Sequence, residues 1–474
     1  MIRSQTLSAH TALIAFLICV LSACGSGSGG SNNSASTTPA PETEADTPST
    51  PEITYFSGND GVYGEELWKT DGTEAGTVMV KNINPDEEGV APNDSKPNNF
   101  FAFNGKTYFR AKTEDEGSEL WVTDGTEAGT FLLKDHITGA NSGSPNQFTI
   151  YKNQLFYRAK NADDFPNDTL WKTDGTKAGT TIAVNISGLD LYPDITVFQQ
   201  QLVFSAKDDT SGSEVWISDG TTIGSQLLKD TNAGSDHGFP ANFTEFNGAL
   251  FFGSSNNNSG RALWKSDGTT AGTSIVVDLG NANTLANNPR DLTVFNQSLY
   301  FGAEDGTEGH ELWITNGNPV ATAVVDDIQT GTGSSEAGSL SVFNGQLFFK
   351  ADNGVNGVEP WTSDGNPNSA TLLKDINPTG DSQPKLLGAV NGKAVFVADD
   401  GVHGREPWVT DGTNAGTKLL KDINNDAGQA SSPQLIAQRG DGILFTAEDS
   451  ASHVQLWITD GTAEGTKLLK AFNP

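Results

Sequence analysis

The stretch from Glu66 to Thr77 reads ELWKTDGTEAGT, and eight more versions of it follow along the chain. Each version carries one tryptophan, so the repeats account for all nine tryptophans: Trp68, Trp121, Trp171, Trp216, Trp264, Trp313, Trp361, Trp408 and Trp457. Successive tryptophans are 45 to 53 residues apart. A period in this range is typical of propellers, solenoids and arrays. The sequence therefore predicts nine similar structural units in a row.

One repeat contains the residues of four short strands. In the unit from Phe100 to Ile137, apolar or aromatic runs predict strands at 100–103, 107–111, 119–123 and 131–135. Asn104 and Gly105 separate the first two runs, and Asn-Gly is a strong hairpin signal because both central residues of a type I′ turn have positive φ. No segment shows the periodicity of a helix. The unit is thus predicted to be a four-stranded antiparallel meander.

Nine such units predict an all-β fold, a β-propeller of about nine four-stranded antiparallel blades, which leaves only short, protected sheet edges. The first unit begins at Ile53 with the pattern of a second strand, so its blade is expected to lack one strand, which gives 35 strands in total. The last unit ends with its fourth strand at 468–470, so no terminal strand remains to complete the first blade. Because nine blades exceed the usual four to eight, an open or irregular β-repeat ring is the alternative.

Three residues after each tryptophan stands an aspartate, or in one repeat an asparagine, and glycine follows it in all nine repeats. These positions are Asp71, Asp124, Asp174, Asp219, Asp267, Asn316, Asp364, Asp411 and Asp460. Their side chains accept hydrogen bonds from backbone N–H groups two or three residues on, and glycine takes the positive φ that follows. We therefore predict structural repeat turns and no cofactor. A ring of Ca²⁺ sites is the alternative, although calcium takes six to eight oxygens and each turn offers one carboxylate.

Two further positions of the repeat carry opposite charges. Glutamate stands two residues before the tryptophan in six repeats, and lysine stands thirteen residues after it in six, as in Glu66 and Lys81. Because the third and fourth strands are antiparallel neighbours, cross-strand Glu–Lys pairs are expected. The tryptophans are predicted to form the repeat core by packing between blades. An exposed ring of indoles that stack on sugar rings is the alternative.

The N-terminus has the features of a lipoprotein signal. A basic residue, Arg3, and an apolar run over 12–21 precede small residues and Cys24, and such a run is too short to span a bilayer but typical of secretory signals. The Leu-Ser-Ala-Cys ending resembles the bacterial lipobox, which implies that Cys24 is acylated and anchors the chain in a membrane. An ordinary signal peptide with a chance cysteine is the alternative. Gly25 is similar to the sorting residue of outer-membrane lipoproteins, and which face of that membrane the protein occupies stays open.

The domain organisation follows from composition. Residues 1–23 are expected to be the signal peptide and 24–51 the acylated cysteine followed by a disordered tether, because Gly, Ser, Asn, Thr and Pro dominate that segment. Residues 52–474 are expected to form the propeller. The whole chain has 28 basic and 59 acidic residues and a net charge of −31, which argues against a nucleic-acid partner and against docking on anionic lipid headgroups.

The repeated Glu-Leu-Trp-x-x-Asp-Gly-Thr pattern resembles the ELWxxDGT repeat family of bacterial surface proteins over residues 53–470. The resemblance implies an exported bacterial protein of tandem β repeats and brings no catalytic activity or ligand with it. More distantly, the Asp-Gly turn is similar to the Asp-box hairpin of sialidase propellers. The arginine cluster and tyrosine nucleophile of sialidases are not discernible in this sequence.

No catalytic residue is predicted, because the six histidines show neither metal-ligand spacing nor a partner serine or cysteine. His237 and Arg290 lie in links between blades and are the first places to look for a unique site. The leading hypothesis is a non-enzymatic envelope lipoprotein whose loops bind an unknown protein or glycan or mediate adhesion. The alternatives are a structural envelope scaffold, and a polysaccharide-acting hydrolase or lyase. An enzyme of that kind would need Arg, Tyr, His and carboxylates to converge at one pore mouth.

Overall fold

The computed structural model describes residues 52–85, 92–164, 166–256, 260–280, 289–440 and 442–472. The chain divides into two compact units, Met1–Thr50 and Pro51–Pro474, and the described residues belong to the second. The predicted signal peptide, Cys24 and the tether lie outside the described residues. Within the described ranges, no helix has both the length and the apolar character needed to cross a membrane.

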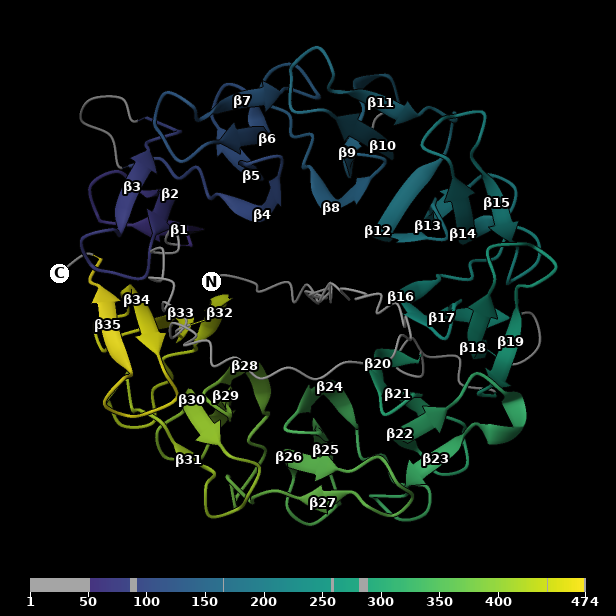
Figure 1. Ribbon diagram of the computed structural model, residues 1–474, viewed down its shortest axis with the longest axis vertical. Coiled ribbons are helices and arrows are strands. Elements are labelled where there is room, and N and C mark those ends of the chain that lie inside the picture. Colours follow the sequence, from purple (N-terminus) through teal and green to yellow (C-terminus); the bar gives the residue numbers. More distant parts are fainter. Residues whose placement is uncertain are drawn as a thin grey trace, which may run out of the picture. The chain divides into compact units, whose positions relative to one another are not determined.

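Nine antiparallel sheets follow one another around a ring in the unit Pro51–Pro474, as the blades of a β-propeller (Figure 1). The strands of blades 1 to 3 are β1 (Thr54–Asn59), β2 (Glu65–Thr70), β3 (Val78–Lys81), β4 (Asn98–Phe103), β5 (Lys106–Thr113), β6 (Gly117–Thr123), β7 (Phe131–Lys134), β8 (Asn146–Tyr151), β9 (Gln154–Lys160), β10 (Asp168–Thr173) and β11 (Thr181–Val184). Those of blades 4 to 6 are β12 (Asp190–Phe198), β13 (Gln201–Asp208), β14 (Gly212–Ser218), β15 (Gln226–Lys229), β16 (Ala241–Phe246), β17 (Ala249–Asn256), β18 (Gly260–Ser266), β19 (Ser274–Asp278), β20 (Arg290–Phe295), β21 (Ser298–Glu304), β22 (His310–Thr315) and β23 (Ala323–Asp326). Those of blades 7 to 9 are β24 (Gly338–Phe343), β25 (Gln346–Asp352), β26 (Val358–Ser363), β27 (Thr371–Leu372), β28 (Lys385–Val390), β29 (Lys393–Asp399), β30 (Arg405–Thr410), β31 (Lys418–Leu419), β32 (Gln434–Arg439), β33 (Gly442–Glu448), β34 (Val454–Thr459) and β35 (Lys467–Lys470). Two short 3₁₀ turns, η1 (Ala162–Asp164) and η3 (Pro319–Ala321), complete the described elements.

The predicted fold class is confirmed. Eight sheets have four strands and the first has three, in the order β1-β2-β3. The first blade therefore lacks the innermost strand that β4, β8, β12 and β16 supply in the blades that follow (Figure 1). The expected Asn-Gly hairpin joins β4 to β5, where Asn104 and Gly105 have φ of 48° and 71°. Both values lie in the left-handed region that a type I′ turn requires.

The hydrophobic core lies between neighbouring blades rather than inside any one sheet. One cluster combines Tyr108 and Leu120 of blade 2 with Leu155, Tyr157 and Trp171 of blade 3. A four-stranded sheet of this size cannot bury its faces alone, so each blade depends on the next one for stability.

Proline shortens the fourth strand in two blades. In blades 7 and 8 the residue before the tryptophan is Pro360 or Pro407, where the other repeats have leucine or valine. Proline has no N–H to donate to the ladder. Accordingly β27 and β31 are two residues long, and the carbonyls of the prolines instead accept bonds from Leu373 and Leu420.

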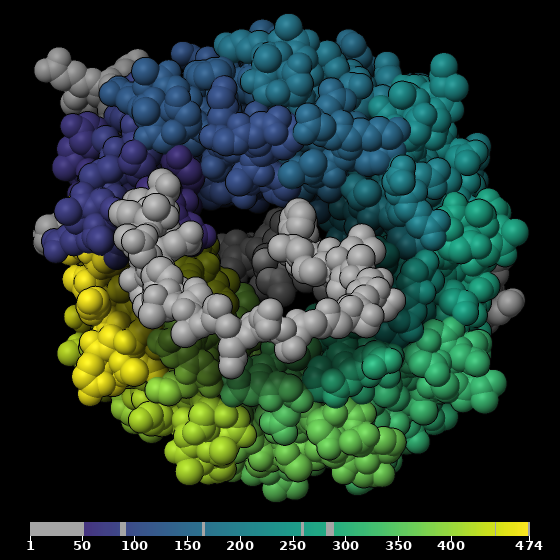
Figure 2. Space-filling model, in the orientation of Figure 1, coloured from purple at the N-terminus to yellow at the C-terminus, as the bar shows by residue number. Residues whose placement is uncertain are grey.

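In the described part of the chain, the ring closes without exchange of a strand between its first and last blades. Trp68 of blade 1 and Phe472 at the end of blade 9 make an edge-to-face contact with ring centroids 5.0 Å apart. Arg439 of β32 donates hydrogen bonds to the backbone oxygens of Glu52 and Asp71 in blade 1. Figure 2 shows these first and last blades, purple and yellow, side by side. The alternative of an open ring was therefore wrong, and packing together with Arg439 closes the propeller.

Candidate functional site

The nine tryptophans are buried at the blade junctions, with exposed fractions between 5% and 9%. Trp121 packs against Leu67 and Val80 of the preceding blade, and Trp171 meets the ring of His136 edge-to-face at 4.7 Å. Indoles this deeply buried cannot stack on a sugar ring. The alternative of an exposed aromatic ring of tryptophans is therefore excluded, and any aromatic platform has to come from other residues.

The Asp-Gly turns form closed hydrogen-bond units at the junction of the third and fourth strands. Asp71 Oδ1 accepts bonds from the backbone N–H and the hydroxyl of Thr73, at 2.9 and 2.7 Å. These bonds lower the pKa of the Asp71 carboxyl. A Cβ at Gly76 would lie 2.0 Å from the same oxygen, which explains the second glycine of the motif. Among the described residues there is no group of three or more His, Cys, Asp or Glu that could hold a metal ion.

The expected Glu–Lys pairs do not form. Lys81 lies opposite Leu67 rather than Glu66, because a bulge between Leu67 and Trp68 shifts the register of β3. The Lys81 ammonium instead bonds the carbonyl of Thr130 in the next blade, at 2.9 Å. The sequence pattern does not fix the register of the two strands to within one residue, and this register determines which residue lies opposite Lys81.

The six glutamates anchor the links between blades. All six side chains are fully buried. The residues are Glu66, Glu119, Glu214, Glu311, Glu359 and Glu406. Glu66 accepts bonds from Ile83 N at 2.7 Å and from Ser95 Oγ at 2.6 Å, both in the link to blade 2. Burial raises the pKa of Glu214 and of Glu311 to about 7, against the opposing effect of these donors. The glutamates therefore hold each link against its blade, and no single one is set apart as catalytic.

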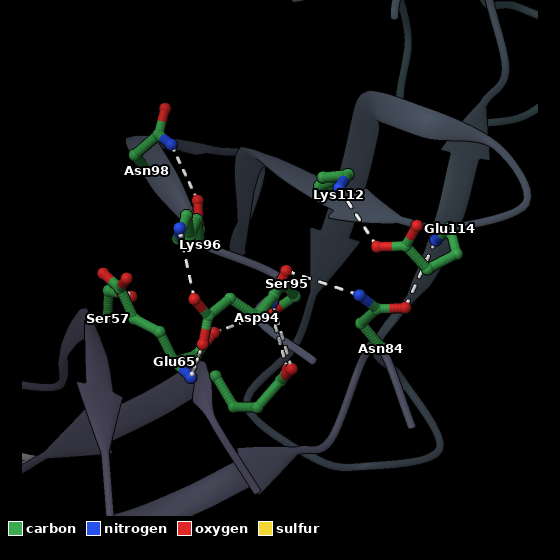
Figure 3. A network of polar contacts seen from close by, with 10 residues as sticks. Ser57, Glu65, Asn84, Asp94, Ser95, Lys96, Asn98, Lys112 and Glu114 are labelled. Carbon is green, nitrogen blue, oxygen red and sulfur yellow. Dashed lines mark hydrogen bonds and ion pairs between the residues drawn. The ribbon is translucent and has the colours of Figure 1, made fainter. Parts of the chain in front are cut away.

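A second link position caps an N–H group at the start of the strand that carries the tryptophan. In blade 1 the N–H of Glu65 donates to Asp94 Oδ1 at 2.9 Å, and Asp94 also pairs with Lys96 (Figure 3). In blade 4 the N–H of Ser213 donates to His237 Nδ1 at 2.9 Å. His237, singled out from the sequence, thus occupies a repeated capping position. Since Nδ1 accepts a bond, the neutral ring carries its proton on Nε2 and presents a donor to its surroundings.

Two carboxylates meet at the corresponding place between blades 3 and 4, where Asp168 begins β10 and Asp190 begins β12. The N–H of Asp168 donates to Asp190 Oδ1 at 2.8 Å. Asp168 also lies 3.4 Å from Arg158 Nε, and both side chains are largely covered, with exposed fractions of 18% and 15%. Burial raises the pKa of Asp168, Arg158 opposes that shift and Asp190 adds to it. Two neighbouring acids, one of which has a raised pKa, are an arrangement that general acid–base chemistry uses.

Aromatic and basic side chains adjoin these carboxylates. Tyr192 follows Asp190 on β12 and meets the ring of Phe239 at 6.0 Å. Phe239 is 38% exposed, and it stacks on His237 at 4.8 Å. The Arg261 guanidinium lies 6.0 Å from the Phe239 ring and donates to the carbonyl of Gly238 at 3.0 Å. Chain segments from blades 3, 4 and 5 therefore converge here.

We call this convergence the Asp168 cluster; it comprises Arg158, Asp168, Asp190, Tyr192, His237, Phe239 and Arg261. It contains the Arg, Tyr, His and carboxylate groups that an enzyme would need at one place. Sequence reasoning found only His237 among them. The available signal was the variability of one repeat position, three residues before the tryptophan, where glutamate, serine, aspartate, arginine, histidine and valine alternate from blade to blade.

The other histidines have separate environments. His136 Nδ1 lies 2.6 Å from Glu119 and Nε2 lies 3.0 Å from the Tyr157 hydroxyl, all deep between blades 2 and 3. Burial lowers the pKa of His136. Its position, fifteen residues after the tryptophan, is apolar in seven other repeats, so His136 takes the place of a core residue. Within the described ranges, no histidine ring bonds the side chain of a serine or cysteine.

Arg290, the other residue singled out from the sequence, lies apart from the Asp168 cluster. It begins β20 and pairs with Glu336 in the link to blade 7, with an N–O distance of 2.9 Å. His310 of the same blade is buried, and neither of its ring nitrogens has a hydrogen-bond partner among the described residues.

No protein-family model and no curated protein matches the chain, so the resemblance to the ELWxxDGT family stays a prediction. Solved structures do match. A puromycin hydrolase aligns with a TM-score of 0.40 and 12% identity over 76% of this chain and 58% of its own. A structure from a study of two prolyl endopeptidases aligns at 0.42 and 12% over 69% and 49%, and oligopeptidase B from Leishmania major at 0.42 and 10% over 71% and 49%. The chain spans about half the length of these proteins.

These matches correct the leading hypothesis from the sequence. A non-enzymatic module for binding or adhesion was expected, whereas the matched proteins are a hydrolase and peptidases, and that expectation is withdrawn. Identities near 12% concern the fold alone, and the likeness carries no argument about the reaction or the substrate of this chain. The function therefore has to be argued from its own residues.

Proposed function

We propose that the protein is a glycosidic-bond-cleaving enzyme that acts on a polysaccharide at the Asp168 cluster. The observation that carries the proposal is the Asp168–Asp190 pair: Asp190 Oδ1 accepts the backbone N–H of Asp168, and burial together with Asp190 raises the pKa of the Asp168 carboxyl. Most glycoside hydrolases use two carboxyl groups, one as the acid that protonates the leaving oxygen and one as the base or nucleophile. Asp168, with its raised pKa, suits the acid, and Asp190 would be the second carboxyl group.

The reaction then runs as a hydrolysis. The Asp168 carboxyl gives its proton to the glycosidic oxygen as the bond from that oxygen to the anomeric carbon breaks. Asp190 stabilises the positive charge that develops on the sugar ring and takes a proton from the attacking water. Arg158, beside Asp168, stabilises the carboxylate that the acid becomes. The sum of the steps is addition of one water across the glycosidic bond.

The neighbouring side chains suit a sugar substrate. Phe239 is 38% exposed, and its ring stacks on His237 and contacts Tyr192 edge-to-face. Sites for small organic ligands combine aromatic surface with a few oriented polar groups. The Nε2 proton of His237 and the hydroxyl of Tyr192 supply such groups next to the platform.

The test is an activity screen of the purified full-length protein on polysaccharides, with analysis of the products. New reducing ends are expected with the wild-type protein and not with Asp168→Asn, which keeps the size of the side chain but cannot donate the proton. The matched control is Asp426→Asn, an exposed aspartate in the link between blades 8 and 9. Unsaturated sugar products would assign a lyase instead. Full activity of Asp168→Asn would refute the assignment of the site.

We further propose that Cys24 carries a lipid anchor and that the protein is exported to the bacterial cell envelope, on the outer membrane. The proposal is supported by the lipobox-like residues that end at Cys24. Mass spectrometry of the mature N-terminus should find an acylated Cys24, and Cys24→Ser should release the protein from the membrane fraction. An unmodified Cys24 in a soluble wild-type protein would contradict the anchor.

A further inference from the structure

A basic side chain recurs at one place in six of the nine blades, although it comes from two different strands. In blades 2, 3 and 7 it stands on the second strand, where Arg110, Arg158 and Lys350 pair with the residue before the tryptophan. In blades 5, 6 and 8 it stands on the third strand, as Arg261, His310 and Arg405, three residues before the tryptophan. We call these six residues the basic ring.

The two positions are diagonal neighbours on one face of the sheet, within reach of long side chains. Blades with a basic residue on the third strand have a small or short residue on the second, such as Gly253 opposite Leu263 in blade 5. In blade 6 a Cβ added to Gly302 would lie 2.7 Å from the ring of His310. A basic group therefore occupies the same space in different repeats, although it is attached to different strands. Simple copying of one repeat does not produce this pattern.

Three of the basic groups extend to the start of the first, innermost strand of a blade. Arg158 donates to the carbonyl of Leu191, Arg261 to that of Gly238 and Arg405 to that of Gln383, at 2.9 to 3.0 Å. All three carbonyls lie in, or just before, the first strand of a blade. Those strands line the middle of the ring of blades (Figure 1).

Most members of the basic ring have no ion-pair partner among the described residues. In the part of the chain that the structure describes, Arg110, Arg261, Lys350 and Arg405 form no ion pair with an acidic side chain. The chain as a whole has a net charge of −31, so carboxylates are abundant elsewhere. Unpaired guanidinium and ammonium groups gathered in an acidic protein attract anions, and guanidinium binds carboxylate or sulfate through two parallel hydrogen bonds.

Blade 6 adds an independent observation. His310 is 2% exposed, and both of its ring nitrogens lack a hydrogen-bond partner. Burial lowers the pKa of its imidazole, and Arg290 and Lys350 add to this effect, whereas Glu336, the ion-pair partner of Arg290, opposes it. A buried polar group without a partner is costly, so unpaired donors in native structures call for an explanation. A ligand oxygen beside His310, Arg290 and Lys350 would supply one.

We infer that the substrate is an acidic polysaccharide, whose carboxylate or sulfate groups bind the basic ring on either side of the Asp168 cluster. The inference rests on the proposed function and names its substrate class. The partly exposed members, Arg110, Arg158, Lys350 and Arg405, would hold successive charged sugars along the blades, and Arg158 would bind the one nearest the reacting bond. Arg261 and His310 are buried, with exposed fractions of 5% and 2%.

The experiment measures binding of the full-length protein to polygalacturonate, which carries carboxylates, to dextran sulfate and to neutral dextran. Tight, salt-sensitive binding is expected for one or both charged polymers and not for dextran. The double variant Arg110→Ala/Lys350→Ala should weaken it by about tenfold or more, since a hydrogen bond to a charged group contributes about 1.5–3 kcal/mol. Neither side chain makes a hydrogen bond in the described structure, so the double variant is expected to fold. Lys418→Ala, an exposed lysine on β31, is the control and should bind like the wild type.

The outcomes separate this inference from the proposed function. Equal affinity for dextran, or an unchanged affinity in the double variant, would overturn the basic ring as a binding site, even if Asp168-dependent cleavage is found. Binding to dextran sulfate alone would support the ring and assign sulfate as its ligand. Saturable binding with no cleavage by any variant would support the ring and refute the enzyme.

Discussion

Removal of one buried glutamate should loosen the junction of two blades. Glu406 accepts short hydrogen bonds from two backbone N–H groups, those of Ile423 and Ser431 at 3.0 and 2.8 Å, and from the Ser431 hydroxyl at 2.6 Å, and the Asn424 N–H adds a longer bond at 3.4 Å. Glu406→Ala leaves these donors buried between the blade and the link that leads to blade 9. The serine hydroxyl can rotate to another acceptor, whereas the two N–H groups are fixed by the backbone.

The expected loss follows from those two groups. A buried donor left without a partner costs about 1–3 kcal/mol, so we expect about 3 kcal/mol for Glu406→Ala. Unfolding entropy is about 2.1 cal/mol/K per residue, or roughly 0.9 kcal/mol/K for a propeller of this length, so the melting temperature should fall by about 3 °C. Glu406→Gln keeps one acceptor and should lose less. Gln455, which takes this place in blade 9, shows that an amide is accommodated there, because its oxygen accepts the N–H of Phe472.

Differential scanning calorimetry of the full-length protein measures the effect, with Glu464→Ala as the control. Glu464 is an exposed acid on the turn between β34 and β35, and its removal should leave the midpoint unchanged. Hydrogen exchange should locate the loss in the link from 420 to 433. If the Glu406→Ala and Glu464→Ala variants have the same melting temperature, the glutamates do not hold the links as described.

Four further outcomes are expected. Gly129→Ala should cost about 2 kcal/mol in urea denaturation, because its Cβ would lie 2.0 Å from Asp124 Oδ1, and adding Asp124→Ala should recover part of the loss. Arg439→Leu should speed proteolysis at the closure of the ring, where Arg439 bonds two backbone oxygens; an unchanged digestion pattern would contradict the closure. Burial raises the pKa of Glu214 and Glu311 to about 7, so their contribution is complete below the unfolded value near 4.5 and is lost as pH rises through 7; the urea midpoint should fall between about pH 5 and about pH 8, and less steeply in Glu214→Gln/Glu311→Gln. EDTA should leave the melting temperature unchanged, whereas a lower midpoint would favour the calcium alternative.

Periodicity and turn chemistry were sufficient to predict the fold. One tryptophan per repeat, the Asn-Gly signal at Asn104 and the start of the first repeat at Ile53 together predicted nine blades and the three strands of the first. These features are local, so they can be read from neighbouring residues along the chain.

Register and long-range partners could not be predicted in the same way. The bulge between Leu67 and Trp68 moves Lys81 away from Glu66, and nothing in the spacing of these residues reveals that shift. The Asp168 cluster joins residues from blades 3, 4 and 5, and the closure of the ring joins Arg439 to residues more than 360 positions away. Such contacts depend on how blades pack, which a repeat pattern leaves undefined.

The most direct test of the account is the cleavage of acidic polysaccharide by the wild-type protein and by Asp168→Asn, measured as new chain ends under identical conditions. The account predicts that the wild-type protein produces them and that the variant, while still binding the polymer, does not. Equal product from both proteins would contradict the role of Asp168, and the absence of product from the wild type on every acidic and neutral polymer would contradict the proposed enzyme.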